Sequence, residues 1–228
     1  MKEGILYVVA TPIGNLADIT LRALEVLKKV DFVICEDTRR TSKLLQYYEI
    51  KKRLVSYHQH SKLRKIDWIT RQLKNGKEVA LVSDAGTPGI NDPGGILVNG
   101  INKINQETRR KIKIVPIPGS SASTAALSVS GFPCDKFLFL GFLPRKKGRN
   151  KLLESLKKEK KVVVLYESCY RVVKTLEELK GVFGKRELCV CRELTKKFES
   201  IYRGSFNEVV KRIKEKQKGE FVVIINKL

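Results

Sequence analysis

The residues that most clearly suggest ligand binding or catalysis lie in the loop Ser83–Gly94, which has the sequence SDAGTPGINDPG. An apolar run, residues 79–82, leads into this loop, and an apolar helical pattern beginning at Ile96 follows it. Glycine lacks a Cβ atom and proline fixes φ, so a loop rich in both is rigid and lets its backbone approach a ligand. Asp84 and Asp92 add carboxylates at the carboxyl end of the predicted strand, where open α/β sheets bind ligands. These features favour a ligand loop over an ordinary strand–turn–helix connection.

A second charged segment, Glu36-Asp37-Thr38-Arg39-Arg40, directly follows the predicted strand 31–35. A carboxylate pair beside two arginines can orient a substrate hydroxyl and hold its phosphates. The alternative is a helix N-terminus, where the acids favour the helix dipole and the arginines are solvated. Taken alone, the segment favours this alternative.

A third candidate segment is Gly119-Ser120-Ser121-Ala122, which opens a helix of small residues. The N–H groups of such a helix start can face a carboxylate or a phosphate. The sequence has no GxGxxG after its first strand and no GxxxxGK[ST] motif, which argues against an ordinary dinucleotide fold and a P-loop nucleotidase. Several Gly-rich loops at strand ends are instead expected to converge on a pocket between two domains.

The histidines and cysteines give little support to a metal site. The two histidines form the pair His58-x-His60, which would share one face of a strand, but no third ligand lies nearby in sequence. The five cysteines contain no CxxC pair, and several lie within apolar runs. We therefore expect reduced, mostly buried thiols and no metal.

Strands and helices alternate in the first half at a spacing typical of βαβ units and a largely parallel sheet. Asp18 or Thr20 is the expected N-cap of the first helix, and Asn75-Gly76 marks the end of the helix before the Ser83–Gly94 loop. Apolar runs predict the strands at 4–10, 31–35, 54–57, 79–82 and 112–117.

The second half is expected to form a separate α/β domain. The chain turns abruptly at Pro116–Ala122, and we place the domains at 1–117 and 118–228. Ser205 and Glu208 predict a capping box that opens the last helix. Connections through helices and longer loops favour a mixed sheet, with strands predicted at 137–143, 162–166, 187–191 and 221–225.

The charge balance points to a polyanionic partner. The chain carries 46 Lys and Arg against 24 Asp and Glu, a formal net charge of +22. Thermophile surfaces usually raise Glu together with Lys, whereas this excess is one-sided, so RNA or DNA contact is favoured. The longest apolar runs have strand length and the N-terminus shows no signal-peptide pattern, so we expect a cytoplasmic protein.

Four segments together resemble one known family. The family is the ribosomal RNA small subunit methyltransferase I branch of the tetrapyrrole methylase superfamily. The resemblance implies an S-adenosylmethionine-dependent enzyme that 2′-O-methylates a cytidine in small-subunit (16S) ribosomal RNA, near the decoding centre. It also implies two α/β domains with the cofactor in the cleft between them, and a homodimer. The segments, which extend the match over nearly the whole chain, are 4–45 (with ATPIGNL and EDTR), 83–94, 115–132 and 139–149.

The resemblance also implies site residues. The SDAGTPG stretch lies at the position of the family's cofactor loop. The resemblance therefore predicts that the cofactor is contacted by Ser83, Asp84, Ala85, Gly86 and Thr87. Further cofactor candidates in this family are Pro12, Gly14, Ser121, Ala122, Tyr166, Gly219 and Glu220.

Ribose methylation requires alignment of the 2′-oxygen with an activated methyl group and removal of the hydroxyl proton. Glu36 and Asp37 are the candidate bases, and Arg39 is a candidate clamp on the adjacent phosphate. The predicted RNA phosphate contacts are Arg40, Lys43, Arg145, Lys146, Lys147 and Arg149.

The sequence departs from the family at two places. The family commonly has Pro-His after Tyr-Glu-Ser, and here Cys169-Tyr170 takes that place, so we assign no catalytic histidine. Longer members continue past GEFVVIINKL into a small helical extension, so we expect the core to supply any RNA contact that the extension makes.

Two other functions stay open. The same fold can act on a tetrapyrrole or another small molecule, although the basicity and the EDTR and SDAGTPG motifs speak against it. A non-catalytic RNA-binding protein of ribosome assembly is the other alternative, and the intact Gly/Pro loops argue against it.

Overall fold

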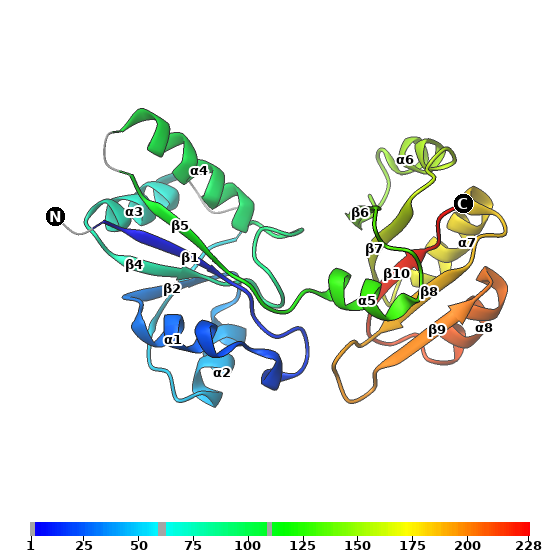
Figure 1. Cartoon of the computed structure of the whole chain (residues 1–228), viewed down its shortest axis with the longest axis horizontal. Helices are drawn as coiled ribbons and strands as arrows, with labels where there is room; N and C mark the ends of the chain where they lie inside the picture. Colours follow the sequence, from blue (N-terminus) through cyan, green and yellow to red (C-terminus); the bar gives the residue numbers. More distant parts are fainter. Residues whose placement is uncertain (1–2, 59–62, 109–110) are drawn as a thin grey trace. The chain divides into compact units, whose positions relative to one another are not determined.

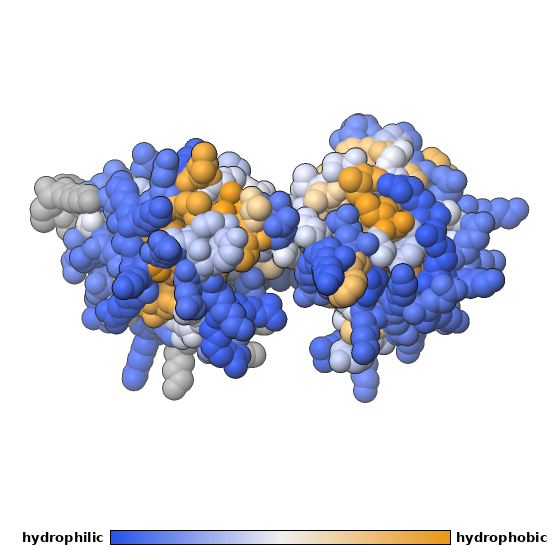
Figure 2. All heavy atoms as spheres, turned by 90° about the horizontal axis from the view of Figure 1, so that it is seen from below, coloured by the Kyte–Doolittle hydropathy of each residue, from blue (hydrophilic) through white to orange (hydrophobic). Residues whose placement is uncertain are grey.

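The computed structural model of the chain describes residues 3–58, 63–108 and 111–228. The chain divides into two compact units, Met1–Ser121 and Ala122–Leu228 (Figure 1). No helix within the described ranges is both long and apolar enough to cross a membrane. Figure 2 shows hydrophilic side chains over most of the visible face of each unit, with smaller hydrophobic patches between them.

Unit 1 is built on a five-stranded sheet of order β3-β2-β4-β1-β5, in which every pairing is parallel. All residues of β2 and β4 are buried, as expected for continuous apolar strands covered on both faces. The prediction of a largely parallel first sheet is confirmed. The strands are β1 (Ile5–Val9), β2 (Phe32–Cys35), β3 (Arg53–Ser56), β4 (Glu78–Leu81) and β5 (Lys113–Ile117).

Helices cover both faces of this sheet (Figure 1). α1 (Leu21–Lys29) and α2 (Thr38–Tyr47) pack on one face, and α3 (Leu63–Lys74) and α4 (Gly94–Glu107) pack on the other. Of the two expected caps, Thr20 is the N-cap of α1, because its side chain accepts a hydrogen bond from the amide of Ala23. Asp18 instead ends a short 3-10 helix, η1 (Leu16–Asp18).

Unit 2 contains a five-stranded sheet of order β6-β7-β10-β8-β9. β6 and β7 are parallel and the other pairings are antiparallel, so the predicted mixed sheet is confirmed. The strands are β6 (Phe137–Phe142), β7 (Val162–Ser168), β8 (Leu188–Arg192), β9 (Ser200–Gly204) and β10 (Glu220–Ile225).

The helices of unit 2 also cover both faces of its sheet. α5 (Ala122–Ser130) packs on one face, and α6 (Arg149–Leu156), α7 (Val172–Phe183) and α8 (Phe206–Glu215) pack on the other. The predicted capping box at the start of α8 is present with both of its hydrogen bonds.

Sequence patterns missed two elements of unit 2. β9 is a short edge strand in which only Tyr202 is fully buried, so it shows no continuous apolar run. α6 fully buries only Arg149 and Leu156, so its apolar face is weak. It begins directly after Gly148, which has a φ of +82°.

Candidate active site

The predicted motifs of unit 1 all follow strands at the same edge of its sheet. β1, β2 and β4 are parallel neighbours, so their carboxyl ends lie side by side. Residues 10–20 follow β1, Glu36 and Asp37 follow β2, and residues 82–93 follow β4. The parallel order therefore collects the candidate residues at the edge where such sheets bind ligands.

The loop after β4 is fastened to the segment after β1. The backbones of Thr11 and Gly86 exchange two N–H···O hydrogen bonds, each 2.9 Å long. The hydroxyl of Thr11 also donates to the carbonyl oxygen of Ser83 at 3.3 Å. Gly86 has a φ of +81°, and a Cβ atom there would lie 3.4 Å from Cγ2 of Ile13. Glycine therefore permits the backbone conformation of this loop.

Two predicted cofactor residues shape this loop with their side chains. Oγ of Ser83 donates to the carbonyl oxygens of Ala85 and Gly86 at 3.2 Å. Oγ1 of Thr87 donates to the carbonyl oxygen of Ser120 at 3.1 Å. The hydroxyls are thus engaged within unit 1, and Ala85 is exposed between them. Any ligand contact from these residues would come mainly from the backbone.

Asp92 also has a structural role. Its Oδ1 accepts hydrogen bonds of 2.7 Å from the amides of Gly89 and Gly94. The carboxylate therefore closes the turn that leads into α4, a role in which Asp is common.

Asp84 connects the ends of β4 and β2. Its Oδ1 accepts a 3.0 Å hydrogen bond from the amide of Asp37, and its Oδ2 lies 3.6 Å from Nη1 of Arg40. The side chain of Asp84 is only 26% exposed. An amide and a guanidinium thus fix this carboxylate at the edge of the sheet.

Asp37 and Arg39 form a local pair at the start of α2. Asp37 is the N-cap and accepts from the Arg39 amide at 2.9 Å. Its carboxylate also accepts from Nε and Nη2 of Arg39, at 3.1 and 2.7 Å. The side-chain and backbone hydrogen bonds from Arg39 hold the pKa of Asp37 far below its usual range. Asp37 is therefore a weak base, and its place as the N-cap of α2 agrees with the helix-start interpretation of this segment.

Glu36 has the opposite electrostatic environment. It is half-buried, and burial raises the pKa of its carboxyl group. The negative charges of Asp84 and Asp92 raise this pKa further. A carboxylate with a raised pKa takes up a proton more readily. Of the two candidate bases, Glu36 is the one whose surroundings suit that role.

A pocket of about 170 Å³ lies beside this edge. Its lining includes both predicted cofactor-binding residues and predicted RNA-binding residues. Glu36 does not line this pocket; it lines a smaller hollow together with Tyr57 and Asp92. Ser83 borders both, which makes the two hollows neighbours. The residues that line the larger pocket are Thr11, Pro12, Leu16, Arg40, Thr41, Lys43, Leu44, Ser83 and Asp84.

The other predicted cofactor residues of the first segments are less enclosed. Gly14 is exposed in the turn after Pro12. Ser121 is the last residue of unit 1 and Ala122 begins α5 in unit 2, and both are half-buried.

In unit 2, Tyr166 lies near the carboxyl end of β7. Its hydroxyl oxygen accepts a 3.3 Å hydrogen bond from the amide of Ser123, at the start of α5. Its ring meets the ring of Phe139 edge to face, with centroids 5.0 Å apart. Tyr166 therefore joins α5 to the sheet, and its predicted cofactor contact stays a prediction.

Gly219 and Glu220 lie at the start of β10. Gly219 has a φ of +125°, and a Cβ atom there would lie 2.6 Å from Cγ of Glu193. The carboxylate of Glu220 forms an ion pair of 2.8 Å with Lys196. The side chain of Glu220 therefore pairs with a neighbouring loop of the same unit.

Three of the predicted RNA contacts in unit 2, Arg145, Lys146 and Lys147, are exposed after β6, but Arg149 is not. The side chain of Arg149 is 9% exposed, and its Nε donates to Oε2 of Glu178 at 2.8 Å. The guanidinium also donates to the carbonyl oxygen of Pro144 and to Oγ1 of Thr175, each at 2.9 Å. The prediction that Arg149 contacts RNA is therefore wrong, because its donors are used inside the unit.

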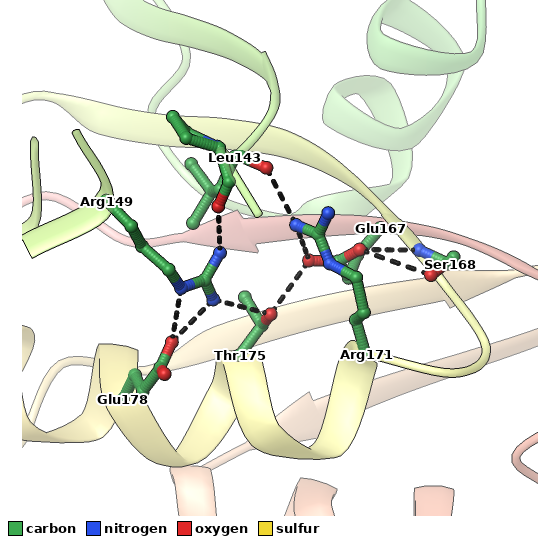
Figure 3. A network of polar contacts seen from close by, with 8 residues as sticks. Leu143, Arg149, Glu167, Ser168, Arg171, Thr175 and Glu178 are labelled. Carbon is green, nitrogen blue, oxygen red and sulfur yellow. Dashed lines mark hydrogen bonds and ion pairs between the residues drawn. The ribbon is translucent and has the colours of Figure 1, made fainter. Parts of the chain in front are cut away.

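Arg149 belongs to a buried network that sequence reasoning missed (Figure 3). Glu167, fully buried, accepts from Oγ1 of Thr175 at 2.7 Å and from Nη2 of Arg171 at 2.9 Å. Arg171 also donates to the carbonyl oxygen of Leu143 at 2.7 Å. A charged Glu within an otherwise apolar strand was the signal for such a network, because a buried carboxylate must be paired.

The structure describes no metal site. Within 3–58, 63–108 and 111–228, no group of three His, Cys, Asp or Glu side chains could hold a metal ion. His60 lies outside the described residues. All five cysteines are free thiols, of which Cys35, Cys189 and Cys191 are buried.

Comparison with known proteins identifies the family. The model of the tetrapyrrole (corrin/porphyrin) methylases matches residues 5–210. The chain belongs to this family. It is a methyltransferase whose cofactor is S-adenosylmethionine.

Several curated relatives of the methylase are named ribosomal RNA small subunit methyltransferase I. The protein of Thermotoga maritima is 46% identical, over 98% of each chain. That of Bacillus subtilis is 46% identical over 97% of this chain and 75% of its own length. That of Escherichia coli O157:H7 is 44% identical over 98% of this chain and 78% of its own length.

Solved structures show the same fold at low sequence identity. The methyltransferase CobJ matches with a TM-score of 0.70 and 17% identity, over 99% of this chain and 95% of its own. The uroporphyrin-III C-methyl transferase of Thermus thermophilus, in complex with S-adenosyl homocysteine, matches with a TM-score of 0.66 and 16% identity, over 97% of both chains. The predicted fold class is confirmed.

The residues of unit 1 fit the cofactor chemically. Asp84 supplies a fixed carboxylate that can accept hydrogen bonds from ribose hydroxyls or an ammonium group. Pro12 and Leu16 line the same pocket and supply an apolar surface against which a nucleoside can pack. Ala85 presents exposed backbone with only a methyl side chain in the way. These are the residues of the methylase that would hold the cofactor from unit 1.

Proposed function

We propose that this methylase transfers a methyl group to the ribose 2′-oxygen of a cytidine in small-subunit ribosomal RNA. The observation that carries the proposal is the shared name of relatives at 44–46% identity over nearly the whole chain. The net charge of +22 supports an RNA substrate over a small molecule. The cytidine and the 2′-oxygen are the finer part of the proposal and rest on the motif resemblance.

In this proposal Glu36 is the general base. Bound S-adenosylmethionine supplies a methyl group that is already activated by a sulfonium centre. The ribose hydroxyl is a poor acid, so a carboxylate that accepts its proton lowers the barrier. The raised pKa of Glu36 makes it a better acceptor than Asp37, which Arg39 holds in the ionised form.

The cations of α2 position the substrate. Arg40 and Lys43 line the pocket that contains Asp84, so a phosphate next to the reacting ribose can be held there. Arg39 is 86% exposed and keeps its predicted role as a clamp on an adjacent phosphate. The fastening of Thr11 to Gly86 keeps the loop fixed during binding, so less alignment entropy is lost in the reaction.

The proposal includes expectations about the whole protein. The homodimer and the cytoplasmic location that the resemblance implies stay predictions, as do contacts from Gly14, Ser121, Ala122, Tyr166, Gly219 and Glu220 to the cofactor.

The second candidate is methylation of a tetrapyrrole or another small molecule. The observation in its favour is the fold that the chain shares with uroporphyrin-III C-methyl transferase. The sequence identity to that enzyme is 16%, against 46% to the Thermotoga maritima relative, so the fold alone does not favour its substrate.

The decisive experiment offers labelled S-adenosylmethionine with naked rRNA, 30S subunits and uroporphyrinogen III in parallel. We expect label in the RNA, mapped to one ribose by a nuclease-resistant dinucleotide. Label in the porphyrinogen would overturn the proposed substrate. Failure to bind the cofactor in calorimetry would favour a non-catalytic RNA-binding protein, whereas cofactor binding with no transfer to any of the three would point to another substrate.

A further inference from the structure

One edge of the unit 2 sheet collects loops from all five strands. β6, β7 and β8 end there, and β9 and β10 begin there. The register places Phe142 opposite Tyr166, Ser168 opposite Glu220, and Arg192 opposite Ser200. Strands about 4.8 Å apart make this edge a row about 19 Å long. We call it the loop edge: residues 142–148, 169–171, 193–199 and 216–220.

Side chains brace the neighbouring loops to one another. Nη2 of Arg171 donates to the carbonyl oxygen of Leu143 at 2.7 Å, which ties the β7–α7 loop to the β6–α6 loop. Nε2 of Gln217 donates to the carbonyl oxygen of Cys169 at 2.7 Å, which adds the α8–β10 loop.

The β8–β9 loop is braced in the same way. Arg192, which is 8% exposed, donates to the carbonyl oxygens of Lys218 at 2.6 Å and Phe198 at 2.8 Å. Lys196 bridges the carboxylates of Glu193 and Glu220, at 3.0 and 2.8 Å. The four loops therefore form one continuous scaffold.

Part of this scaffold is held in an unfavourable backbone conformation. Glu193 and Thr195 have φ angles of +52° and +65°. Non-glycine residues adopt such angles at a cost and only where the surroundings enforce them, which is common at functional sites. The bracing contacts supply that enforcement here.

The scaffold presents aromatic rings to solvent. Tyr170 is 91% exposed, Phe198 is 65% exposed and Phe142 is 51% exposed. Phe142 lies against Tyr166, with ring centroids 5.8 Å apart, whereas Tyr170 projects from a short turn. Exposed rings on a braced scaffold leave apolar area for a partner to cover, and they lose little entropy when a flat partner binds.

The loops that carry these rings also carry cations, and Nζ of Lys197 lies over the Phe198 ring, 5.7 Å from its centroid. The exposed cations of the loop edge are Arg145, Lys146, Lys147, Lys197, Lys216 and Lys218. Its acids are largely engaged within the scaffold, because Lys196 pairs with Glu193 and Glu220. Glu199 accepts a hydrogen bond from the amide of Thr195. The edge thus carries net positive charge beside flat apolar rings.

We infer that the loop edge docks a single-stranded segment of the RNA substrate, with bases stacked on Tyr170 and Phe198 and phosphates on the neighbouring cations. The inference rests on the proposed function, because it assigns the surface through which rRNA is held. Stacking on protein rings requires bases that are already unpaired, so the edge selects single strands over duplexes. The cations follow the phosphate backbone without regard to sequence.

Tryptophan reporters test the stacking directly. Tyr170→Trp and Phe198→Trp place an indole at each proposed stacking position, and Phe137→Trp is the matched control. Phe137 is 46% exposed but lies at the first residue of β6, the opposite end of the same sheet. We expect oligouridylate to quench the first two reporters relative to the wild type and to leave the control unchanged. Equal quenching in all three, or in none, would overturn the inference.

Affinity gives the second measurement. Loss of one stacked base is expected to weaken binding of labelled oligouridylate by about five- to a hundredfold, so Tyr170→Ala and Phe198→Ala should each do so. Tyr170→Phe keeps the ring and should bind like the wild type, and Phe137→Ala should as well. A duplex of oligouridylate with oligoadenylate should be bound equally by all variants. Unchanged affinity for oligouridylate in both alanine variants would refute the stacking role.

Methyl transfer to rRNA by the same samples separates this inference from the proposed function. Quenching and ring-dependent affinity without any transfer to rRNA would retain the docking edge and overturn the substrate. Normal transfer with ring-independent RNA affinity would retain the function and overturn the docking edge. Ring-dependent binding of 30S subunits, with no ring dependence for oligouridylate or naked rRNA, would also overturn it in favour of a ribosomal protein partner.

Discussion

The amide nitrogen of Asp37 donates a 3.0 Å hydrogen bond to Oδ1 of Asp84, which joins the ends of β2 and β4. This contact fixes the backbone next to Glu36 and brings the carboxylate of Asp84 towards it. Two adjacent acids then have opposite protonation behaviour. Arg39 stabilises the charge of Asp37, whereas burial and Asp84 disfavour the charge of Glu36.

Glu36→Gln is expected to lower the rate of methyl transfer by about 10²- to 10⁴-fold, the usual contribution of a general base. The KM for RNA should change little, because the substitution removes no cation. In the wild type, log kcat should rise with pH until Glu36 is ionised and then level off. Single-turnover transfer measured across pH checks both statements. A Glu36→Gln rate within a few-fold of the wild type, or a rate that is independent of pH, would exclude Glu36 as the base.

The same substitution should raise stability at neutral pH. The folded-state pKa of Glu36 is raised, so the folded protein favours the protonated form, and stability is lost as pH rises through that pKa. Glutamine cannot ionise and avoids this loss. The Tm of Glu36→Gln should therefore exceed that of the wild type at about pH 7, and the difference should vanish near the unfolded pKa of about 4.3. A lower Tm for the variant at neutral pH would contradict this electrostatic account.

Asp37→Asn is the matched control, since it makes the same chemical change one residue away. Asparagine caps helices about as well as aspartate, so the fold should be retained and methyl transfer should stay within a few-fold of the wild type. The pKa of Asp37 is lowered, so its charge contributes stability above the unfolded pKa, and that contribution is lost as pH falls. The Tm of the variant should be slightly lower than that of the wild type at pH 7, and the difference should shrink at low pH. A loss of activity as large as that of Glu36→Gln would move the base to Asp37.

Much of the candidate site at the carboxyl end of the unit 1 sheet was predictable, because it depends on local sequence features. Apolar runs such as 79–82 defined the parallel strands, and glycine and proline marked the loop that follows. The sequence could not separate Glu36 from Asp37, since the difference arises from Arg39 on one side and from Asp84, distant in sequence, on the other. It also could not show that Arg149 points inward. That orientation depends on Glu178 and Thr175 of α7, which only the packing of α6 on α7 brings into reach.

Gly86→Ala should weaken cofactor binding. A side chain at the φ of +81° costs about 1–2 kcal/mol. Relief of that strain shifts the loop away from Thr11, and we expect about a tenfold weaker Kd for S-adenosylmethionine in calorimetry. Gly131→Ala is the matched control, because Gly131 has a φ of +79° in unit 2 and no atom within 4 Å of the added Cβ. It should lose similar stability and keep its affinity. Equal affinity in both variants would remove this loop from the cofactor site.

Lys146→Ala and Arg149→Met should have opposite effects on RNA binding and on stability, because Lys146 is exposed and Arg149 is buried in the same segment. Lys146 is exposed, so its loss should leave Tm unchanged and reduce the slope of log K against log salt for single-stranded RNA by about 0.7. Arg149→Met leaves Glu178 and Thr175 without their guanidinium partner, and breaking a buried pair costs about 3–5 kcal/mol. We therefore expect a clear fall in Tm and, at a temperature where the variant is folded, an unchanged salt slope. Filter binding across salt concentrations, with thermal unfolding of the same samples, measures both quantities. A reduced slope in Arg149→Met would return this arginine to the RNA-binding surface and would mean that the Glu178 pair opens when RNA binds.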